Sequence, residues 1–139
     1  MEFRLLVATE NSEFGKTLRE LTEAARAMLP IQLEVLHASS LDQVRERLVT
    51  WRPDALMLDW NPAQANMMGA LADLLADHAD LRVMILLPDS AREYREAVWR
   101  AGACACIPRD RADPEWLQAV LCVMNRARDR EARIRSGVR

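Results

Sequence analysis

The stretch RPDALMLDWNP, residues 52–62, decides the fold that this sequence predicts. Residues 55–58 are all apolar, and such a short run without a polar face is typical of a strand buried on both sides of a parallel sheet. Asp59 follows directly and would stand at the carboxyl end of that strand. A buried strand that ends in a carboxylate indicates an α/β protein with its functional site at the end of the sheet.

Runs of the same kind recur on both sides of this stretch, at residues 3–8, 31–36, 83–87 and 103–107. The segments between them have the apolar spacing of helices, which we expect at residues 12–29, 40–51, 63–78, 90–100 and from Asp113 onward. Ser40 and Ser90 open capping boxes, and Asp113 precedes a proline. This alternation predicts a flavodoxin-like, three-layer α/β/α fold with five helices and a five-stranded parallel sheet in the order 2-1-3-4-5.

The composition fits one globular domain. The chain has 139 residues, of which 50% are hydrophobic and 29% charged, so it can bury a sizeable core. Its formal net charge of −2 disfavours nucleic acid as the main partner. No apolar run approaches the roughly 20 residues that span a bilayer, and we see no signal peptide, so we expect a cytoplasmic protein without a membrane partner. We interpret Cys104, Cys106 and Cys122 as reduced, small apolar core residues.

A Gly-Lys-Thr sequence at residues 15–17 suggests a nucleotide-binding loop after the first strand. A Walker A motif needs a glycine at the position of Glu10, whose negative charge would instead face the phosphates. Lys16 and Thr17 would also lie inside the predicted helix and point away from the strand end. We therefore interpret them as ordinary helix surface, and a small flavodoxin-like ligand- or nucleotide-binding domain is only our second hypothesis for the function.

Two carboxylates stand at the same end of the predicted sheet. Glu10 follows the first strand and Asp59 ends the third, and these two strands are neighbours in the expected order. Two hard oxygen ligands suit Mg²⁺, which binds through one or two carboxylates together with phosphate. A carboxylate can also attack phosphorus and form an aspartyl phosphate. The pair therefore indicates a phosphoryl site that uses Mg²⁺.

The segments RLLVATEN, RPDALMLDWNP and AVWRAGACACIPRD, at residues 4–11, 52–62 and 97–110, resemble the receiver domain of two-component response regulators. The resemblance covers about residues 2–125 and implies a signalling module in a phosphorelay rather than an enzyme. It makes Asp59 the candidate phosphoacceptor and Arg109 the equivalent of the family's lysine. It implies a sensor histidine kinase or another signalling protein as the partner.

The resemblance also assigns a metal site and two switch positions. The metal ligands would be Asp59, Glu10 and the backbone carbonyl of Asn61, with Thr9 at a second, degenerate acidic position. Leu87 matches the position of a hydroxyl residue that contacts the phosphoryl group, and Cys106 matches an aromatic residue on the fifth strand.

Several of these positions depart from the family's pattern. Thr9 replaces one acid of the metal-binding pair, and Leu87 has no hydroxyl. Arg109 keeps lysine's charge without its compact shape, and Cys106 cannot swing as an aromatic ring does. A charged hydrogen bond is worth about 1.5–3 kcal/mol, so the loss at Leu87 alone would weaken phosphorylation. We therefore expect a weakened Mg²⁺ site, impaired phosphorylation of Asp59 and signalling partly through protein contacts.

The remaining expectations concern surfaces. The resemblance implies a surface for a homodimer on the fourth helix, fifth strand and fifth helix, near Trp99 and Trp116. Strand alternation turns Trp60 away from Asp59, where it either packs in the core, shields the site or binds a partner. A receiver-like domain of residues 1–125 would be followed by residues 126–139, an Arg-rich helical extension or tail with six arginines and two acids.

Overall fold

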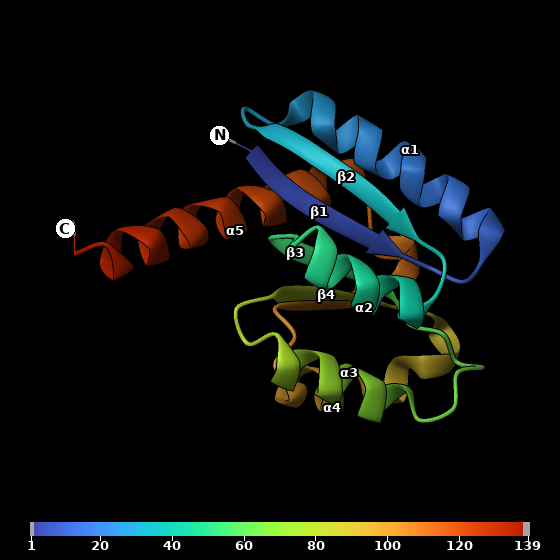
Figure 1. The fold of residues 1–139 in the computed structure, drawn as a ribbon. Helices are drawn as coiled ribbons and strands as arrows, with labels where there is room; N and C mark the ends of the chain where they lie inside the picture. The colour runs from blue at the N-terminus through green and yellow to red at the C-terminus, as the bar shows by residue number, and fades with distance from the viewer. Residues whose placement is uncertain (1, 138–139) are drawn as a thin grey trace.

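The sheet lies between two layers of helices in the computed structural model, which describes residues 2–137 (Figure 1). All strand pairs are parallel, and their order is β2-β1-β3-β4-β5, so the predicted fold class and strand order are confirmed. The strands are β1 (Glu2–Ala8), β2 (Gln32–Ala38), β3 (Ala55–Asp59), β4 (Arg82–Leu87) and β5 (Ala105–Pro108).

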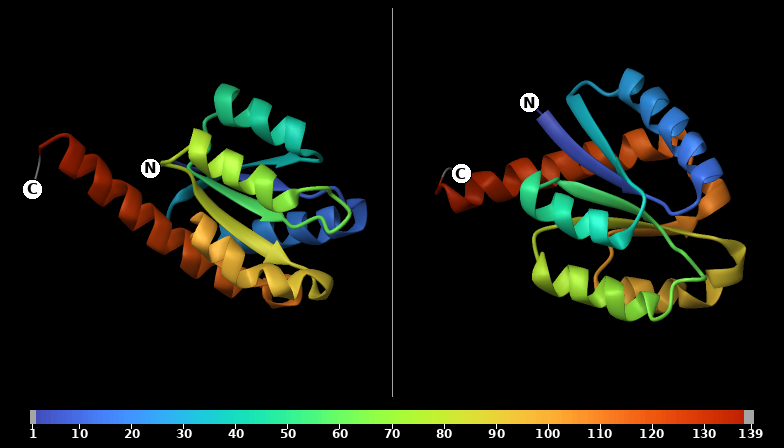
Figure 2. Two further views of the ribbon diagram at one scale, coloured as in Figure 1. Left: turned by 90° about the horizontal axis from the view of Figure 1, so that it is seen from below. Right: turned by 45° about the vertical axis from the view of Figure 1, so that its right-hand side comes forward.

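Within residues 2–137, five α-helices and two short 3₁₀-helices lie between the strands or follow the last one. They are α1 (Ser12–Met28), α2 (Leu41–Thr50), α3 (Met67–Asp77), η1 (Asp89–Tyr94), α4 (Arg95–Ala101), η2 (Arg109–Arg111) and α5 (Pro114–Arg135). Helices α1 and α5 cover one face of the sheet, and α2, α3 and α4 cover the other (Figures 1 and 2). Successive strand residues alternate between these layers: Leu5 packs with α1 and α5, whereas Leu6 packs on the α2 side.

Capping side chains fix where the helices next to the site begin. The Asn11 side chain accepts a hydrogen bond from the Phe14 amide at 3.0 Å and starts α1 immediately after β1. The predicted caps Ser40 and Asp113 do the same for α2 and α5. The Gly-Lys-Thr sequence lies inside α1 with Lys16 exposed, which agrees with its interpretation as helix surface.

Two helix starts differ from the prediction. Helix α3 begins at Met67 rather than at residue 63, because the Asn61 side chain accepts a hydrogen bond from the Ala63 amide at 3.0 Å and holds the chain in a turn. Ser90 caps no helix, because residues 89–94 form η1. The three-residue period of a 3₁₀-helix turns Ala91 and Tyr94 to the same side, where Ala91 is buried.

The start of β5 also differs from the prediction. The strand begins at Ala105, so Cys104 lies before it and is exposed, while Cys106 within it is buried. The interpretation as a small core residue therefore holds for Cys106 and is wrong for Cys104.

Helix α5 runs without a break through residue 125 and projects past the sheet (Figure 2). One side chain on it, Arg128, ties the helix to the start of the sheet. Its guanidinium donates to the carbonyl oxygen of Glu2 at 2.7 Å and to Asp54 Oδ2 at 3.0 Å, and its Cζ lies 5.3 Å from the centroid of the Phe3 ring. From Arg130 onward every described residue of α5 is exposed. Among residues 2–137, no helix is long and apolar enough to span a bilayer.

Candidate functional site

Asp59 ends β3, and only 3% of its side chain is exposed to solvent. Thr9 follows β1, the neighbouring strand, and its hydroxyl donates to Asp59 Oδ2 at 2.7 Å. The Thr9 oxygen in turn accepts a hydrogen bond from the Asn11 amide at 3.1 Å, which fixes the hydroxyl at the start of α1. Thr9, which stands where the resemblance implies a second acid, is therefore a hydrogen-bond donor to Asp59, the candidate phosphoacceptor.

Arg109 follows β5 and holds the other carboxylate oxygen of Asp59. Its Nε and Nη2 atoms lie 2.8 Å and 2.7 Å from Oδ1. Its Cζ lies 4.7 Å from the centroid of the Phe14 ring, which is a cation–π distance, and Nη2 donates to the Trp60 carbonyl at 3.4 Å. The guanidinium is thus fixed by an ion pair, an aromatic face and a backbone oxygen. Phe14 lies on α1, and nothing in the sequence pattern connected its ring with Arg109.

Burial and hydrogen bonding act in opposite directions on the acidity of Asp59. Burial raises the pKa of this carboxyl, because it removes water from the charged form. The hydrogen bonds from Thr9 and Arg109, and the positive charge of Arg109, lower the pKa, but the net result is a pKa above the ordinary value of 3.8. The charged form of Asp59 therefore depends on these two partners.

Glu10 turns away from this cluster and bonds a different partner. The Asn61 amide nitrogen donates to Glu10 Oε2 at 2.5 Å, and both side chains are on the surface. Glu10 and Asn61 line a small hollow together with Asp59, and its volume is about 10 Å³. That volume is about enough for a single water molecule.

The donor set does not fit Mg²⁺ in this arrangement. Mg²⁺ usually keeps several waters in octahedral geometry, and the hollow between Glu10 and Asp59 has room for about one. Both oxygens of Asp59 already accept hydrogen bonds, and the Arg109 guanidinium places a positive charge where a cation would have to approach. Within residues 2–137 no three Asp, Glu, His or Cys side chains are grouped as metal ligands would be. Asp59 would have to leave Arg109 before it could serve as a metal ligand.

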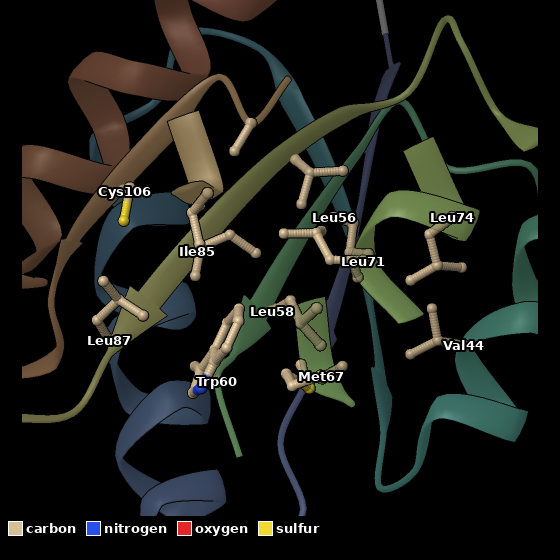
Figure 3. Packing of buried hydrophobic residues seen from close by; sticks show 14 of the residues in the cluster. Val44, Leu56, Leu58, Trp60, Met67, Leu71, Leu74, Ile85, Leu87 and Cys106 are labelled. Carbon is tan, nitrogen blue, oxygen red and sulfur yellow. The ribbon is translucent and has the colours of Figure 1, made fainter. Parts of the chain in front are cut away.

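The two switch positions lie in the hydrophobic core. Leu87 is 3% exposed and Cys106 1% exposed, and both belong to the buried cluster that also contains Trp60 (Figure 3). Burial raises the pKa of the Cys106 thiol, which favours the neutral form. The Leu87 side chain has no polar atom, and the Cys106 thiol is buried. Their role as switch positions stays a prediction.

Trp60 points to the side of the sheet opposite the Asp59 carboxylate, as strand alternation predicts. It is 2% exposed, and its ring stacks on Tyr94 with 5.2 Å between the ring centroids. Because the ring is enclosed, Trp60 is a core residue, and the suggestion that it binds a partner is wrong.

Solved structures with the same fold are receiver domains and related proteins. A response regulator receiver domain from Clostridium thermocellum is 19% identical, with a TM-score of 0.71 over 95% of this chain and 98% of its own. The receiver domain of a DNA-binding response regulator from Colwellia psychrerythraea is 16% identical, with a TM-score of 0.74 over 89% and 98%. A candidate pilus assembly protein from Burkholderia thailandensis is 21% identical, with a TM-score of 0.71 over 88% and 98%. Neither a protein-family model nor a curated protein matches the sequence.

The chain therefore has the receiver fold that the sequence motifs led us to expect. It also brings Thr9, Asp59 and Arg109 together at the carboxyl ends of β1, β3 and β5, while Glu10 and Asn61 form a separate pair. At this level of identity the likeness describes the fold, and the function has to be argued from the chemistry of the site.

Proposed function

We propose that the chain is a receiver-like signalling module of the cytoplasm in which Asp59 is a poor phosphoacceptor and signals pass mainly through protein contacts. The observation that carries this proposal is the ion pair between Arg109 and Asp59. Phosphorylation of a carboxylate requires one of its oxygens to attack phosphorus with an available electron pair. Arg109 contacts Oδ1 through Nε and Nη2, and the Thr9 hydroxyl donates a hydrogen bond to Oδ2, and these contacts make both oxygens of Asp59 weaker nucleophiles.

The surroundings of Asp59 also lack the groups that would stabilise a transferring phosphoryl group. Charge on such a group is normally neutralised by metal ions and preorganised donors. Here Leu87 offers a hydrocarbon side chain, and the Arg109 guanidinium is already neutralised by Asp59. Mg²⁺ would have to be held by Glu10 and the Asn61 carbonyl after Asp59 had been released from Arg109, so we propose that metal binding is weak.

Phosphorylation by acetyl phosphate tests the proposal directly. Wild type and Asp59→Asn are incubated with acetyl phosphate and Mg²⁺, and the covalent phosphoryl group is measured by intact mass spectrometry. We expect no more labelling of wild type than of Asp59→Asn. Rapid, Mg²⁺-dependent labelling of wild type that Asp59→Asn abolishes would overturn the proposal.

A reconstructed site provides the positive control for that experiment. The combined variant Thr9→Asp, Leu87→Thr, Arg109→Lys restores a second acid, a hydroxyl and a compact amine around Asp59. We expect this variant to gain Mg²⁺-dependent labelling that is lost again when Asp59→Asn is added. If the wild type already labels as fast as the reconstructed variant, the three departures do not impair the site.

The surface of α4, β5 and α5 is the proposed contact area for a second copy or a signalling partner such as a histidine kinase. Trp99 on α4 is 45% exposed and Val123 on α5 is 64% exposed, so large apolar side chains face solvent on both helices. Multi-angle light scattering tests the homodimer: we expect Trp99→Ser to shift the protein toward the monomer, whereas Arg45→Ser on α2 leaves its mass unchanged.

A further inference from the structure

Beside β5 the surface is hollowed over a volume of about 590 Å³, at the end of the sheet where Asp59 lies. Three arginines from different elements line it: Arg92 from η1, Arg95 from the start of α4 and Arg111 from η2. Leu87, Ile107 and Pro108 supply apolar surface to the same hollow. We propose that this basic hollow binds a small phosphate-bearing ligand about the size of a nucleotide.

The arginines of the basic hollow have no partners among the described residues. Arg92, Arg95 and Arg111 form no ion pair within 4.0 Å and no side-chain hydrogen bond with any residue of 2–137. Their neighbours in the chain behave differently, because Arg100 pairs with Glu96 and Arg109 pairs with Asp59. Three unpaired guanidinium groups that line one hollow favour an anion with several oxygens, because each of them can bind oxygens in a bidentate manner.

Two aspartates at the basic hollow limit what kind of anion fits. Asp89 and Asp110 line it as well, yet neither lies within ion-pairing distance of the three arginines. The side chains that line the hollow therefore carry three positive and two negative formal charges. A ligand that is anionic throughout would be repelled by the aspartates. A ligand with phosphate at one end and hydroxyl or amino groups at the other would use both sets of side chains.

The size and the apolar lining favour a small molecule over a bare ion. Sites for small organic ligands typically have volumes of about 300–1,000 Å³ and combine apolar lining with a few polar groups. The basic hollow falls within that range, and its apolar residues end β4 and β5. Of these residues, Ile107 and Pro108 are partly exposed and would contact a ring such as a nucleobase, while the arginines hold the phosphate.

The basic hollow adjoins the Asp59 cluster without using its residues. Pro108 directly precedes Arg109, and Leu87 ends the strand that lies between β3 and β5. Binding there would therefore contact the residue next to Arg109 without requiring phosphorylation of Asp59. The inference goes beyond the proposed function and stands if Asp59 is never phosphorylated.

Titration with ATP in the absence of Mg²⁺ tests the inference by two-dimensional ¹H–¹⁵N NMR. The hollow variant Arg92→Ser, Arg95→Ser, Arg111→Ser removes the proposed contacts. A matched control, Arg126→Ser, Arg130→Ser, Arg133→Ser, removes the same charge from α5, where these arginines form no ion pair with any residue of 2–137. Circular dichroism and the urea midpoint establish that both variants are folded.

We expect ATP to shift the amide signals around Leu87, Ile107 and Arg111, and to do so equally in Asp59→Asn. The dissociation constant should rise about tenfold or more in the hollow variant, which corresponds to about 1.4 kcal/mol, and hardly change in the control variant. Inorganic triphosphate should bind more weakly than ATP, because it lacks the ring that contacts the apolar residues.

Three outcomes would overturn the inference. One is the absence of binding to wild type at millimolar ATP. A second is equal weakening by the hollow and control variants, which would mean that ATP responds to overall charge. The third is tighter binding of a hexaglutamate peptide than of ATP at Arg92, Arg95 and Arg111. That result would make the hollow a docking site for an acidic protein segment.

Discussion

Arg109 Nη2 lies 2.7 Å from Asp59 Oδ1, although the strands that lead to these two residues are not neighbours in the sheet. Strand β4 separates β3 from β5, so the ion pair reaches across the end of β4 at Leu87. The pair is largely buried, with 3% of the Asp59 side chain and 26% of the Arg109 side chain exposed. Removing one partner of such a pair leaves a buried charge, so both residues have a structural role besides any role in signalling.

The acidity of Asp59 gives a first prediction. Thr9→Val removes a hydrogen bond that stabilises the charged carboxylate, so it should raise the pKa of Asp59 above its already raised value. Arg109→Met should act in the same direction. ¹³C NMR titration of the Asp59 carboxyl carbon measures both effects, and Thr50→Val on the exposed side of α2 serves as the control. An unchanged pKa in Thr9→Val would contradict the hydrogen bond from its hydroxyl.

The raised pKa of Asp59 also fixes how stability depends on pH. The folded protein binds this proton more tightly than the unfolded chain, so the stabilising contribution is full below the ordinary value of 3.8 and is lost as the pH rises through the folded pKa. As the pH increases across this range, the urea midpoint of wild type should therefore fall relative to that of Asp59→Asn. A difference that stays constant with pH would contradict a raised pKa.

The cysteines should differ in reactivity. Cys104 is exposed, whereas Cys106 is buried and burial raises the pKa of its thiol. Because the thiolate is the reactive form, a disulfide reagent such as DTNB should modify Cys104 quickly in the folded protein and Cys106 only after unfolding. In a Cys122→Ser background, Cys104→Ser should abolish the fast phase and Cys106→Ser should leave it intact. A fast phase that survives Cys104→Ser would show that Cys106 is accessible.

His37 should make the protein less stable in mild acid. Burial and the charge of Arg19 lower the pKa of this histidine below 6.5, outweighing the opposite effect of Glu23. The stability that comes from its neutral form is therefore present above 6.5 and lost as the pH falls through 6.5 toward the folded pKa. Between about pH 7.5 and about pH 5.5 the urea midpoint should fall more in wild type than in His37→Gln. Arg19→Gln should give an intermediate response, and equal falls in wild type and His37→Gln would refute the assignment.

Arg128 should contribute measurably to stability. Arg128→Met removes hydrogen bonds to Asp54 and to the Glu2 carbonyl, and we expect it to lower the free energy of unfolding by about 1–3 kcal/mol. Arg130→Met, two residues further along the exposed part of α5, should change it by less than about 0.5 kcal/mol. Urea denaturation measures both variants. Equal effects would mean that the contacts of Arg128 add nothing beyond the helix itself.

The strand β3 could be predicted from composition alone, because its residues before Asp59 are apolar on both faces. The run at residues 55–58 has no polar face to expose to water, so its residue types alone predict a strand buried between two layers of helices. One error lies where a side chain competes with the backbone for hydrogen bonds. Asn61 delays the start of α3 in this way. Such competition depends on the path of the connecting loop, which periodicity does not determine. The 3₁₀-helix η1 also replaces the first turns of the expected fourth helix at Ser90, and no side-chain hydrogen bond at its start explains this difference.

The residues of the candidate site could be predicted from the sequence, but the hydrogen bonds and ion pairs between their side chains could not. Strand order alone brings Thr9, Asp59 and Arg109 to one end of the sheet, and all three were named from the sequence. Which oxygen each donor contacts depends on side-chain rotamers, and these are set by Phe14 and by the position of α1. Arg92, Arg95 and Arg111 were missed because each resembles an isolated surface charge until η1, α4 and η2 bring them together.

The bond from Arg128 to the Glu2 carbonyl joins two positions 126 residues apart in the chain. Closing so long a loop costs entropy, and contacts of high sequence separation tend to form late in folding. During synthesis the beginning of β1 would therefore be paired with β2 but lack its contact with Arg128 until α5 has left the ribosome. In a chain stalled before residue 128, the start of β1 would be paired on the β2 side only, and its other side would be more open to proteases and to pairing with other chains.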